Sequence, residues 1–251
     1  MNTVFLFAHQ DDEYGVFPAL HEHRRRGDAV HCVYLTDGGP QAQRRCRESL
    51  AVLAELDIAA EHVHFPGCQY SWKDGRLYEQ YADCCRWLVR LLAELAPVGT
   101  VYIPAWEGGH PDHDTVHAAA VVAACRQKKS VSRIRQFSLY NGYRCSGLLF
   151  RAMLPLPCNG PVLHTPLPLT LRLRCIRLCL RYPSQWKTWL GLFFPVALRY
   201  LFTGTQQTQA VLSQRRDRPH AGQLYYERRG FCTWETLSAA LTTNPFEVHH
   251  E

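Results

Sequence analysis

The stretch TVFLFAHQDDE, residues 3–13, places a histidine and three consecutive acids directly after a short apolar run. The run TVFLFA (3–8) has the length of a strand and no alternation of polar and apolar residues. Such strands are typical of parallel sheets that are covered on both faces. The acids then follow the carboxyl end of the strand, the edge at which such sheets bind ligands. This stretch therefore predicts both a fold class and the position of a site.

The first half of the chain continues to alternate between apolar strands and amphipathic helices. Strands are expected at 3–8, 29–36, 61–65 and 100–105, and helices at 13–27, 41–56, 78–95 and 114–127. This order predicts an α/β fold, a Rossmann-like three-layer sandwich with a mostly parallel sheet and right-handed connections. The segments AHQDDE (8–13), TDGG (36–39) and WEGGHPDHD (106–114) each follow a strand. We therefore expect them to meet at the carboxyl ends of the strands and to form the active site there.

The pattern is weaker in the second half of the chain. We expect a fifth strand at 134–140, a sixth at 166–174, and a loop in the Pro-rich stretch at 154–169. No repeat or low-complexity linker interrupts the sequence, so one domain over 1–251 is predicted. Its motif-bearing core would be 1–127, and 128–251 would complete the sheet and cap the site.

Two clusters of histidine and aspartate fall on the expected edge. The first contains His9, Asp11 and Asp12, and the second is HPDHDTVH, residues 110–117. Catalytic zinc needs three nitrogen or oxygen ligands and one open position for water. His9, Asp12 and one histidine of the second cluster can supply that set. Asp11 would then lie beside the metal, free to accept a proton from water, and another histidine could act as an acid or an oxyanion donor.

Each cluster alone also has a purely structural interpretation. Acids at the start of a helix commonly cap it or offset its dipole. For Asp112 and Asp114 we favour such a cap over the orientation of a histidine. Two clusters on one edge of a parallel sheet nevertheless favour the chemical interpretation.

The charges are distributed unevenly along the chain. Residues 1–125 contain 10 Lys and Arg against 17 Asp and Glu, whereas residues 126–251 contain 18 against 5. The acid-free stretch between Asp114 and Asp217 includes a basic, aromatic segment at 170–202. We expect this segment to cap the site and to meet an anionic substrate. The alternative interpretation of this segment is an interfacial surface that contacts an anionic membrane. No nucleic-acid partner is expected, because no binding motif occurs and the first half is acidic.

Apolar runs and cysteines indicate the compartment. The longest apolar candidate, WLGLFFPVAL (189–198), is too short to span a membrane and contains a proline. The N-terminus has no signal-peptide pattern. The 11 cysteines include no CxxC pair and are expected to be reduced. The sequence thus predicts a cytoplasmic protein, with a membrane-peripheral location as the second reading, and leaves the oligomeric state open.

The two clusters carry a family resemblance. AHQDDE at 8–13 resembles the AHPDDE motif of the PIG-L/LmbE-like zinc-dependent N-deacetylases, and HPDH at 110–113 matches the second motif of that family. Smaller similarities occur in the same order: TDGG (36–39), RCRESLAVLAELDI (45–58), KDGRL (73–77) and RYPSQW (181–186). The resemblance covers residues 1–127 well and the remainder thinly. Gln10 stands where the family has proline, which removes no ligand.

The resemblance implies a role for seven residues of this chain. His9, Asp12 and His113 would bind Zn²⁺, with Fe²⁺ as the alternative metal. Asp11 would be the general base. His110 would stabilise the tetrahedral intermediate and protonate the leaving amine. Arg45 and Asp74 would contact the substrate.

The resemblance also implies an activity. The chain would be a hydrolase of a linear amide C–N bond that removes an N-acyl group, in the simplest case N-acetyl, from an amino-sugar conjugate. The expected substrate is an N-acetylglucosamine derivative, either a small molecule or a glycolipid. The basic second half of the chain adds the expectation that its aglycone is anionic or lipid-linked. Two alternatives are an amidase of a related thiol or secondary-metabolite conjugate, and a non-catalytic relative that binds sugar or metal. A phosphoesterase would more commonly need a second metal, whose ligands are sparse here.

Overall fold

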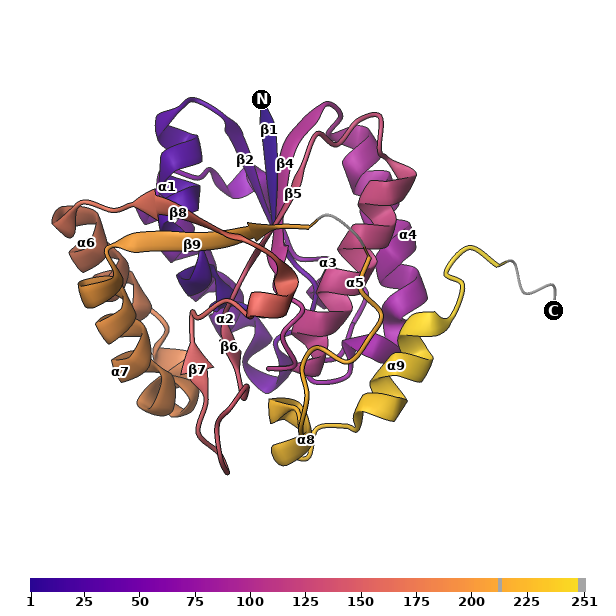
Figure 1. The fold of residues 1–251 in the computed structure, drawn as a ribbon. Coiled ribbons are helices and arrows are strands. Elements are labelled where there is room, and N and C mark those ends of the chain that lie inside the picture. The colour runs from indigo at the N-terminus through magenta and orange to yellow at the C-terminus, as the bar shows by residue number, and fades with distance from the viewer. Residues whose placement is uncertain (212–213, 248–251) are drawn as a thin grey trace.

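A seven-stranded sheet organises the computed structural model, which describes residues 1–211 and 214–247 (Figure 1). Its strand order is β3-β2-β1-β4-β5-β9-β8. The strands are β1 (Asn2–Phe7), β2 (Ala29–Tyr34), β3 (Val63–His64), β4 (Val98–Pro104), β5 (Ile134–Phe137), β8 (Val162–Pro166) and β9 (Thr205–Ala210). The first five in sequence pair in parallel, whereas β9 is antiparallel to both β5 and β8. A separate antiparallel pair consists of β6 (Tyr140–Asn141) and β7 (Arg151–Ala152).

Helices cover both faces of the sheet. One face packs against α1 (Phe17–Arg25), α2 (Ala42–Glu55), α6 (Leu169–Cys179) and α7 (Trp186–Thr203), and the other against α4 (Tyr81–Glu94), α5 (Pro111–Arg126) and α9 (Trp234–Thr242). Strand β1 shows why there are two cores: Val4 and Leu6 enter one, and Phe5 and Phe7 enter the other. The predicted three-layer α/β fold with a mostly parallel sheet is confirmed.

Two short helices lie near the carboxyl ends of the strands. Helix α3 (Pro66–Gln69) packs against the segment after β2, where a Cβ on Gly67 would clash with the backbone of Thr36. Helix α8 (Tyr225–Arg228) begins with a hydrogen bond from the Tyr225 N–H to the Gly108 carbonyl. The C-terminal part of the chain therefore reaches the segment that follows β4.

The prediction for residues 166–174 is wrong. Leu169, Leu171 and Leu173 alternate with polar residues as in a strand, but helix α6 begins at Leu169, directly after Pro168. Its buried residues Cys175, Leu178 and Cys179 follow helical spacing instead. The alternation was too short to distinguish the two periods.

The expected loop at 154–169 contains strand β8, so that prediction is also wrong in part. Strand β8 lies at the edge of the sheet, where prolines at its borders remove no ladder hydrogen bond that the sheet needs. The predicted fifth strand at 134–140 is divided between β5 and β6. Strand β9, with the sequence TQQTQA, has no apolar pattern and was not predicted.

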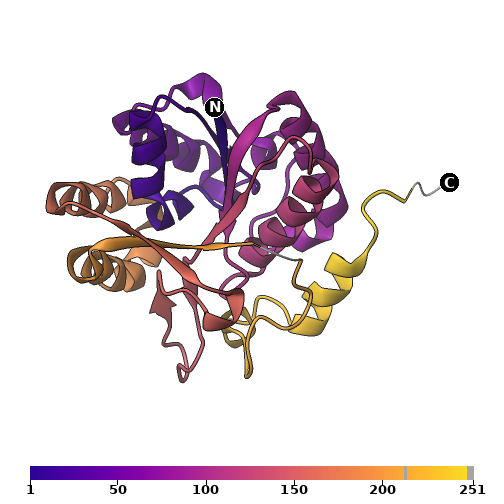
Figure 2. The ribbon, with the colours of Figure 1, turned by 45° about the horizontal axis from the view of Figure 1, so that its top comes forward.

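None of the helices in the part of the chain that the structure describes is long and apolar enough to cross a membrane. The 18 residues of α7 include Pro195. Helices α6 and α7 lie side by side at the outer end of their layer, as two views of the ribbon show (Figures 1 and 2).

Candidate active site

The turn after β1 separates the two adjacent aspartates. The Asp12 carboxylate folds back over the end of the strand, where its Oδ2 accepts the backbone N–H groups of Ala8 at 3.0 Å and His9 at 2.8 Å. Asp11 has a φ of 140°, a backbone conformation that favours glycine. The chain therefore reverses at Asp11, and a 3-10 helix begins at Asp12. This strained turn gives two neighbouring carboxylates different surroundings.

The second cluster lies at the start of α5. His110 is the N-cap, and its Nδ1 accepts the Asp112 backbone N–H at 3.2 Å. His113 follows one turn later, with its Nε2 3.2 Å from Oδ1 of Asp12. Because β1 and β4 are neighbours in the sheet, the segments that follow them bring the two motifs together. The structure thus unites His9, Asp12 and His113, as the sequence predicted that one histidine of the second cluster would join the first.

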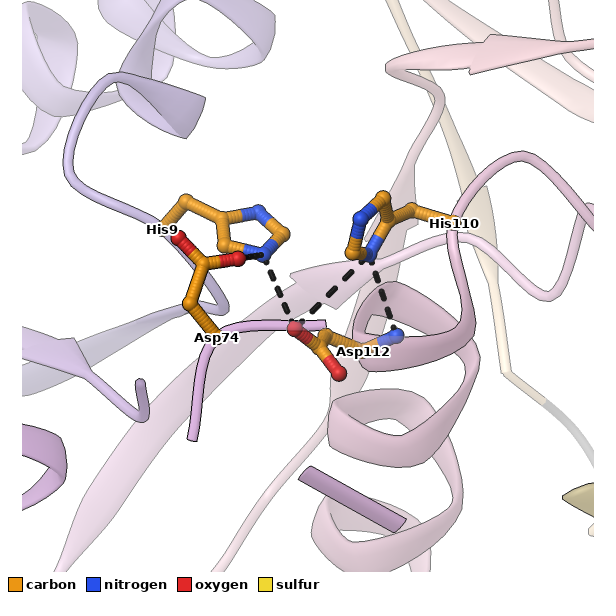
Figure 3. Close-up of side chains that lie close together, drawn as sticks. All are labelled: His9, Asp74, His110 and Asp112. Carbon is orange, nitrogen blue, oxygen red and sulfur yellow. Dashed lines mark hydrogen bonds and ion pairs between the residues drawn. The ribbon is translucent and has the colours of Figure 1, made fainter. Parts of the chain in front are cut away.

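Asp112 orients His9 (Figure 3). The His9 Nε2 lies 3.0 Å from Asp112 Oδ2, and this oxygen also accepts the Gly75 N–H at 2.6 Å. The other oxygen accepts the Leu77 N–H at 2.9 Å. The helix cap that we favoured for Asp112 is therefore wrong, because His110 occupies the cap and Asp112 is wholly buried against His9. The DGRL turn at 74–77 supplies the amides that hold this carboxylate.

His9, Asp12 and His113 fit a divalent metal ion. All three side chains are buried, and their donor atoms lie within 4.8 Å of one another. Two bonds of about 2.0–2.1 Å at the tetrahedral angle separate donor atoms by about 3.3 Å. The observed separations are close to this value: 3.2 Å from Asp12 Oδ1 to His113 Nε2, and 3.6 Å from the other oxygen of Asp12, Oδ2, to His9 Nδ1. Asp112 on the other nitrogen of His9 is the carboxylate–histidine pairing common behind metal ligands.

A second group of possible ligands overlaps the first. It contains His9, Asp74, His110 and Asp112. Both oxygens of Asp112 are already held by backbone amides, and Oδ2 of Asp74 pairs with Arg45 Nη1 at 2.8 Å. Backbone amides therefore occupy both oxygens of Asp112, whereas those that bind Asp12 reach only its Oδ2 and leave Oδ1 facing His113. The donor set of His9, Asp12 and His113 could therefore hold a metal ion with less rearrangement of existing hydrogen bonds than the second group.

A cavity of about 380 Å³ opens over this group. Asp11, Arg45, Asp74 and His110 all line it, so the structure places every predicted catalytic and substrate residue at one pocket. Arg45 reaches both carboxylates, with Nη1 at Asp74 and Nη2 3.6 Å from Asp11. Oδ1 of Asp74 lies 3.3 Å from His9 Nε2, so Asp74 contacts one of the proposed metal ligands as well as lining the cavity.

In the site, burial and the charges of neighbouring side chains act in opposite directions on the pKa values of Asp11, Asp12 and His9. Burial raises the pKa of Asp11, although Arg45 acts in the other direction. Burial also opposes ionisation of Asp12, but His113 and His9 hold its pKa well below the usual range. Burial would lower the pKa of His9, and the carboxylates of Asp74 and Asp12 raise it instead. The buried Glu13, to which the Tyr34 hydroxyl donates a hydrogen bond, has its pKa raised to about 7 by burial.

Asp114 and His117, which also belong to the second cluster, have hydrogen-bond partners outside the proposed metal ligands. Asp114 accepts the N–H groups of Glu107 at 3.1 Å and Gly108 at 3.3 Å, so it holds the loop before α5, and the helix cap that we favoured for it is also wrong. His117 Nδ1 lies 2.9 Å from the Pro104 carbonyl, and burial lowers the pKa of His117 to about 4. Neither residue belongs to the candidate metal groups in the described part of the chain.

The sequence did not identify the pocket residues contributed by the second half. These include three aromatic residues and two exposed cations: Tyr140, Tyr225, Phe231, Lys187 and Arg229. They come from β6, α7 and the region of α8, which are far apart in sequence and follow no motif. The acid-free composition was the one signal that pointed to cations above the site.

Comparisons with known proteins found one matching family model and several similar folds. A family model described as GlcNAc-PI de-N-acetylase matches residues 4–124. The fold is similar to the zinc-inhibited form of teicoplanin deacetylase Orf2, with a TM-score of 0.62 and 16% identity over 84% of this chain and 97% of that one. It is also similar to N,N'-diacetylchitobiose deacetylase from Pyrococcus horikoshii, with a TM-score of 0.55 and 15% identity over 83% and 82% of the two chains.

The same fold also occurs in a protein with another reaction. The 4-carboxy-2-hydroxymuconate hydratase GalB from Pseudomonas putida KT2440 matches with a TM-score of 0.52 and 16% identity over 85% of this chain and 97% of that one. A search of curated proteins found no match. At such identities the likeness concerns the fold alone, so the reaction has to be argued from the site residues.

Proposed function

We infer that this chain is a metal-dependent N-deacetylase, because a family model described as GlcNAc-PI de-N-acetylase matches residues 4–124. It hydrolyses the linear amide of an amino-sugar conjugate, an N-acetylglucosamine derivative in the simplest case. One observation carries this proposal: the donor atoms of His9, Asp12 and His113 converge beside a cavity that His9, Asp12 and Asp11 line. The arrangement combines a site for a Lewis acid with a separate carboxylate base.

The donor set suits either of two metals. Histidine and carboxylate ligands bind both zinc and ferrous iron, and we propose zinc as the resident ion with ferrous iron as the alternative. When bound, the ion would polarise the amide carbonyl and lower the pKa of a water molecule to about 7. His9, Asp12 and His113 would hold it, and Asp112 would keep the His9 ring in place.

Asp11 moves the proton in this proposal. It accepts a proton from the attacking water as the water oxygen bonds to the amide carbon. Arg45, 3.6 Å away, orients the Asp11 carboxylate. The C–N bond then breaks, and the departing nitrogen takes the proton from Asp11. The products are a carboxylic acid and a free amino sugar.

His110 is better placed to donate a hydrogen bond than a proton. Its Nδ1 accepts the Asp112 N–H, so the neutral ring carries its proton on Nε2. From there it can stabilise the oxyanion of the tetrahedral intermediate. We therefore assign delivery of the amine proton to Asp11, whereas the family resemblance had implied His110.

The pocket supports a sugar with an anionic aglycone. Its volume of about 380 Å³ lies at the lower end of ligand pockets. Tyr140, Tyr225 and Phe231 offer aromatic faces, and Lys187 and Arg229 are exposed at the pocket. Neither cation forms an ion pair within residues 1–211 and 214–247. We propose that Lys187 and Arg229 contact a phosphate or another anionic group of the substrate. A glycoside linked to a lipid through a phosphate would also carry such a group.

An amine-release assay tests both parts of this proposal. N-acetylglucosamine glycosides with neutral and with phosphate-bearing aglycones are compared, with and without a chelator. We expect metal-dependent release and a higher kcat/KM for the anionic substrates that declines with salt. No release from any conjugate would contradict the activity, and equal kcat/KM at all salt concentrations would contradict the anionic aglycone.

Charge variants localise the anion. Lys187→Gln and Arg229→Gln should each lower kcat/KM about 5–10-fold for the anionic substrate and leave the neutral one unchanged. Arg177→Gln is the matched control, because Arg177 is an exposed cation of α6 that does not line the pocket. An equal effect of the control would show that general charge, not contact, governs the preference.

A further inference from the structure

Helix α7 carries an uncovered apolar ridge. Trp186, Leu190, Phe194, Leu198 and Phe202 recur at intervals of four, and their exposed fractions are 60%, 74%, 71%, 52% and 80%. Residues four apart lie on one side of a helix. The opposite side is formed by Trp189, Leu192, Val196 and Tyr200, which are buried in the core. Helix α7 is therefore apolar on both sides, and only one of them is covered.

Helix α6 extends the uncovered surface. Leu169, Leu173 and Leu180 are exposed by 55%, 50% and 64%, on the side of the helix opposite to its buried residues. The two helices pack against each other at the outer end of their layer (Figures 1 and 2). Together these eight residues form what we name the α6/α7 apolar face. They are eight of the 14 large apolar residues exposed in the described part of the chain, so the exposure is concentrated here.

Such a concentration indicates a binding surface. Monomeric proteins rarely expose large contiguous apolar patches, and those that do commonly use them for association with proteins or membranes. The charges around the face distinguish these occupants. Residues 115–216 contain 15 Lys and Arg and no acid. Arg177 and Lys187 are exposed on α6 and α7 themselves.

An anionic membrane can bind both the exposed apolar side chains and the neighbouring cations of this surface. A second copy of the chain would bring two positive faces together, which repels them. A nucleic acid would use the cations but would leave the apolar ridge in water. A bilayer with anionic lipids accepts apolar side chains at its interface and attracts the neighbouring cations.

The location of the pocket agrees with this occupant. Lys187, Thr188 and Gly191 line the active-site cavity from the same helix that carries the ridge. A membrane in contact with the ridge would therefore lie beside the pocket. We propose that the α6/α7 apolar face docks this protein on an anionic membrane surface, with α7 lying in the interfacial plane. This proposal concerns binding and does not depend on the deacetylase reaction.

Vesicle binding tests the proposal directly. The full chain is mixed with phosphatidylcholine vesicles with and without phosphatidylserine, and the bound fraction is measured by flotation. We expect binding that requires phosphatidylserine and weakens with salt. The double variant Leu190→Ser with Phe194→Ser should lose at least about tenfold in affinity, because two apolar side chains no longer enter the interface.

A matched variant controls for general hydrophobicity. Leu163→Ser with Tyr70→Ser also replaces one leucine and one aromatic residue, exposed by 42% and 48%, but outside the α6/α7 apolar face. This variant should bind like the wild type. Both double variants alter exposed positions, and far-UV circular dichroism verifies their folding.

Three outcomes would overturn the proposal. The first is a wild-type protein that does not bind phosphatidylserine vesicles, and the second is a Leu190/Phe194 variant that binds as well as the wild type. The third is concentration-dependent dimerisation in sedimentation that the Leu190/Phe194 variant abolishes, without vesicle binding, which would assign the face to a second copy. Because no substrate is present, failure of the deacetylase assay cannot produce any of these results.

Discussion

At the scale of single residues, the neighbours in the sequence HQDDE (9–13) have different surroundings and different proposed roles. Asp12 is fixed by backbone amides toward His113, whereas Asp11 occupies a reversed backbone and lines the cavity. Gln10, at the position of the family proline, is wholly buried, and its Nε2 donates to the Thr36 carbonyl at 3.2 Å. Its side chain ties the first motif to the segment after β2 and takes no position in the ligand group.

Asp112→Asn should weaken metal binding about 10–100-fold, because the Asp112 carboxylate orients His9. The measurement is competition for the metal against a chelator of known affinity. Asp114→Asn is the matched control: Asp114 is equally buried on the same helix, but it accepts backbone amides of 107 and 108. A similar loss in both variants would contradict a specific role of Asp112 and indicate general disturbance of α5.

A histidine cluster on β2, on β3 and at the residue before β3 predicts a loss of stability in acid. The His31 ring lies 4.7 Å from that of His62 and 5.8 Å from that of His64, measured between centroids. Burial, assisted by these two neighbours, lowers the pKa of His31 from 6.5 to about 4. Between these values the unfolded chain binds more protons than the folded chain. The contribution of His31 is therefore complete above pH 6.5 and declines as the pH falls toward 4.

The free energy of unfolding should decrease by about 1–2 kcal/mol through His31 between neutral pH and about pH 5. Urea denaturation of the wild type and of His31→Gln at both pH values measures this contribution, which the variant should lack. His164→Gln, at an exposed position of β8, should retain it. The same pH dependence in all three proteins would exclude His31 as its source.

At the scale of elements, the loop between β4 and α5 depends on a close approach of two backbones. A Cβ at Gly109 would lie 1.9 Å from the carbonyl oxygen of Tyr140 in β6. Backbone cannot yield as a flexible side chain can. This contact places the residue before His110 directly against a strand from the second half of the chain.

Gly109→Ala should destabilise the fold by about 1–3 kcal/mol and lower kcat, because relief of the clash displaces His110. Gly191→Ala is the control, since its Cβ would meet nothing within 4 Å. In the interior of α7 that alanine should stabilise the helix by about 0.5–1 kcal/mol. Urea denaturation measures both effects. An unchanged midpoint for Gly109→Ala would contradict the close contact.

The elements also show what the sequence could and could not predict. Apolar strands and periodic helices in the first half, together with two motifs, were enough to predict the parallel sheet and the edge that carries the site. Strand β9 could not be predicted, because its buried residues Gln206, Thr208 and Gln209 are polar. The amides of Gln206 and Gln209 bond to carbonyls of Gly15, Leu156 and Gly160, contacts that only the folded chain reveals.

Long-range contacts explain why the role of Asp112 was also misjudged. Its partners are His9, Gly75 and Leu77, which are 103, 37 and 35 residues away. Nothing local distinguishes such an aspartate from one that caps a helix. The aromatic lining from β6 and α8 was out of reach for the same reason.

At the scale of the whole molecule, the sheet links the motif-bearing core to the second half of the chain. Strand β9 pairs with β5 and β8, and α6 and α7 share a core with α1 and α2. We propose on this basis that residues 1–251 form one domain. Urea unfolding followed by circular dichroism and by tryptophan fluorescence should then give coincident transitions, and two separate transitions would contradict it.

We propose that His9, Asp12 and His113 hold a catalytic metal ion. The most direct measurement is amine release from an N-acetylglucosamine conjugate by chelator-treated protein during titration with Zn²⁺, with Fe²⁺ in parallel. We predict no release without metal, recovery that saturates at an equimolar amount, and no recovery in Asp12→Ala. Amine release at the wild-type rate by protein shown to be free of metal would contradict the account.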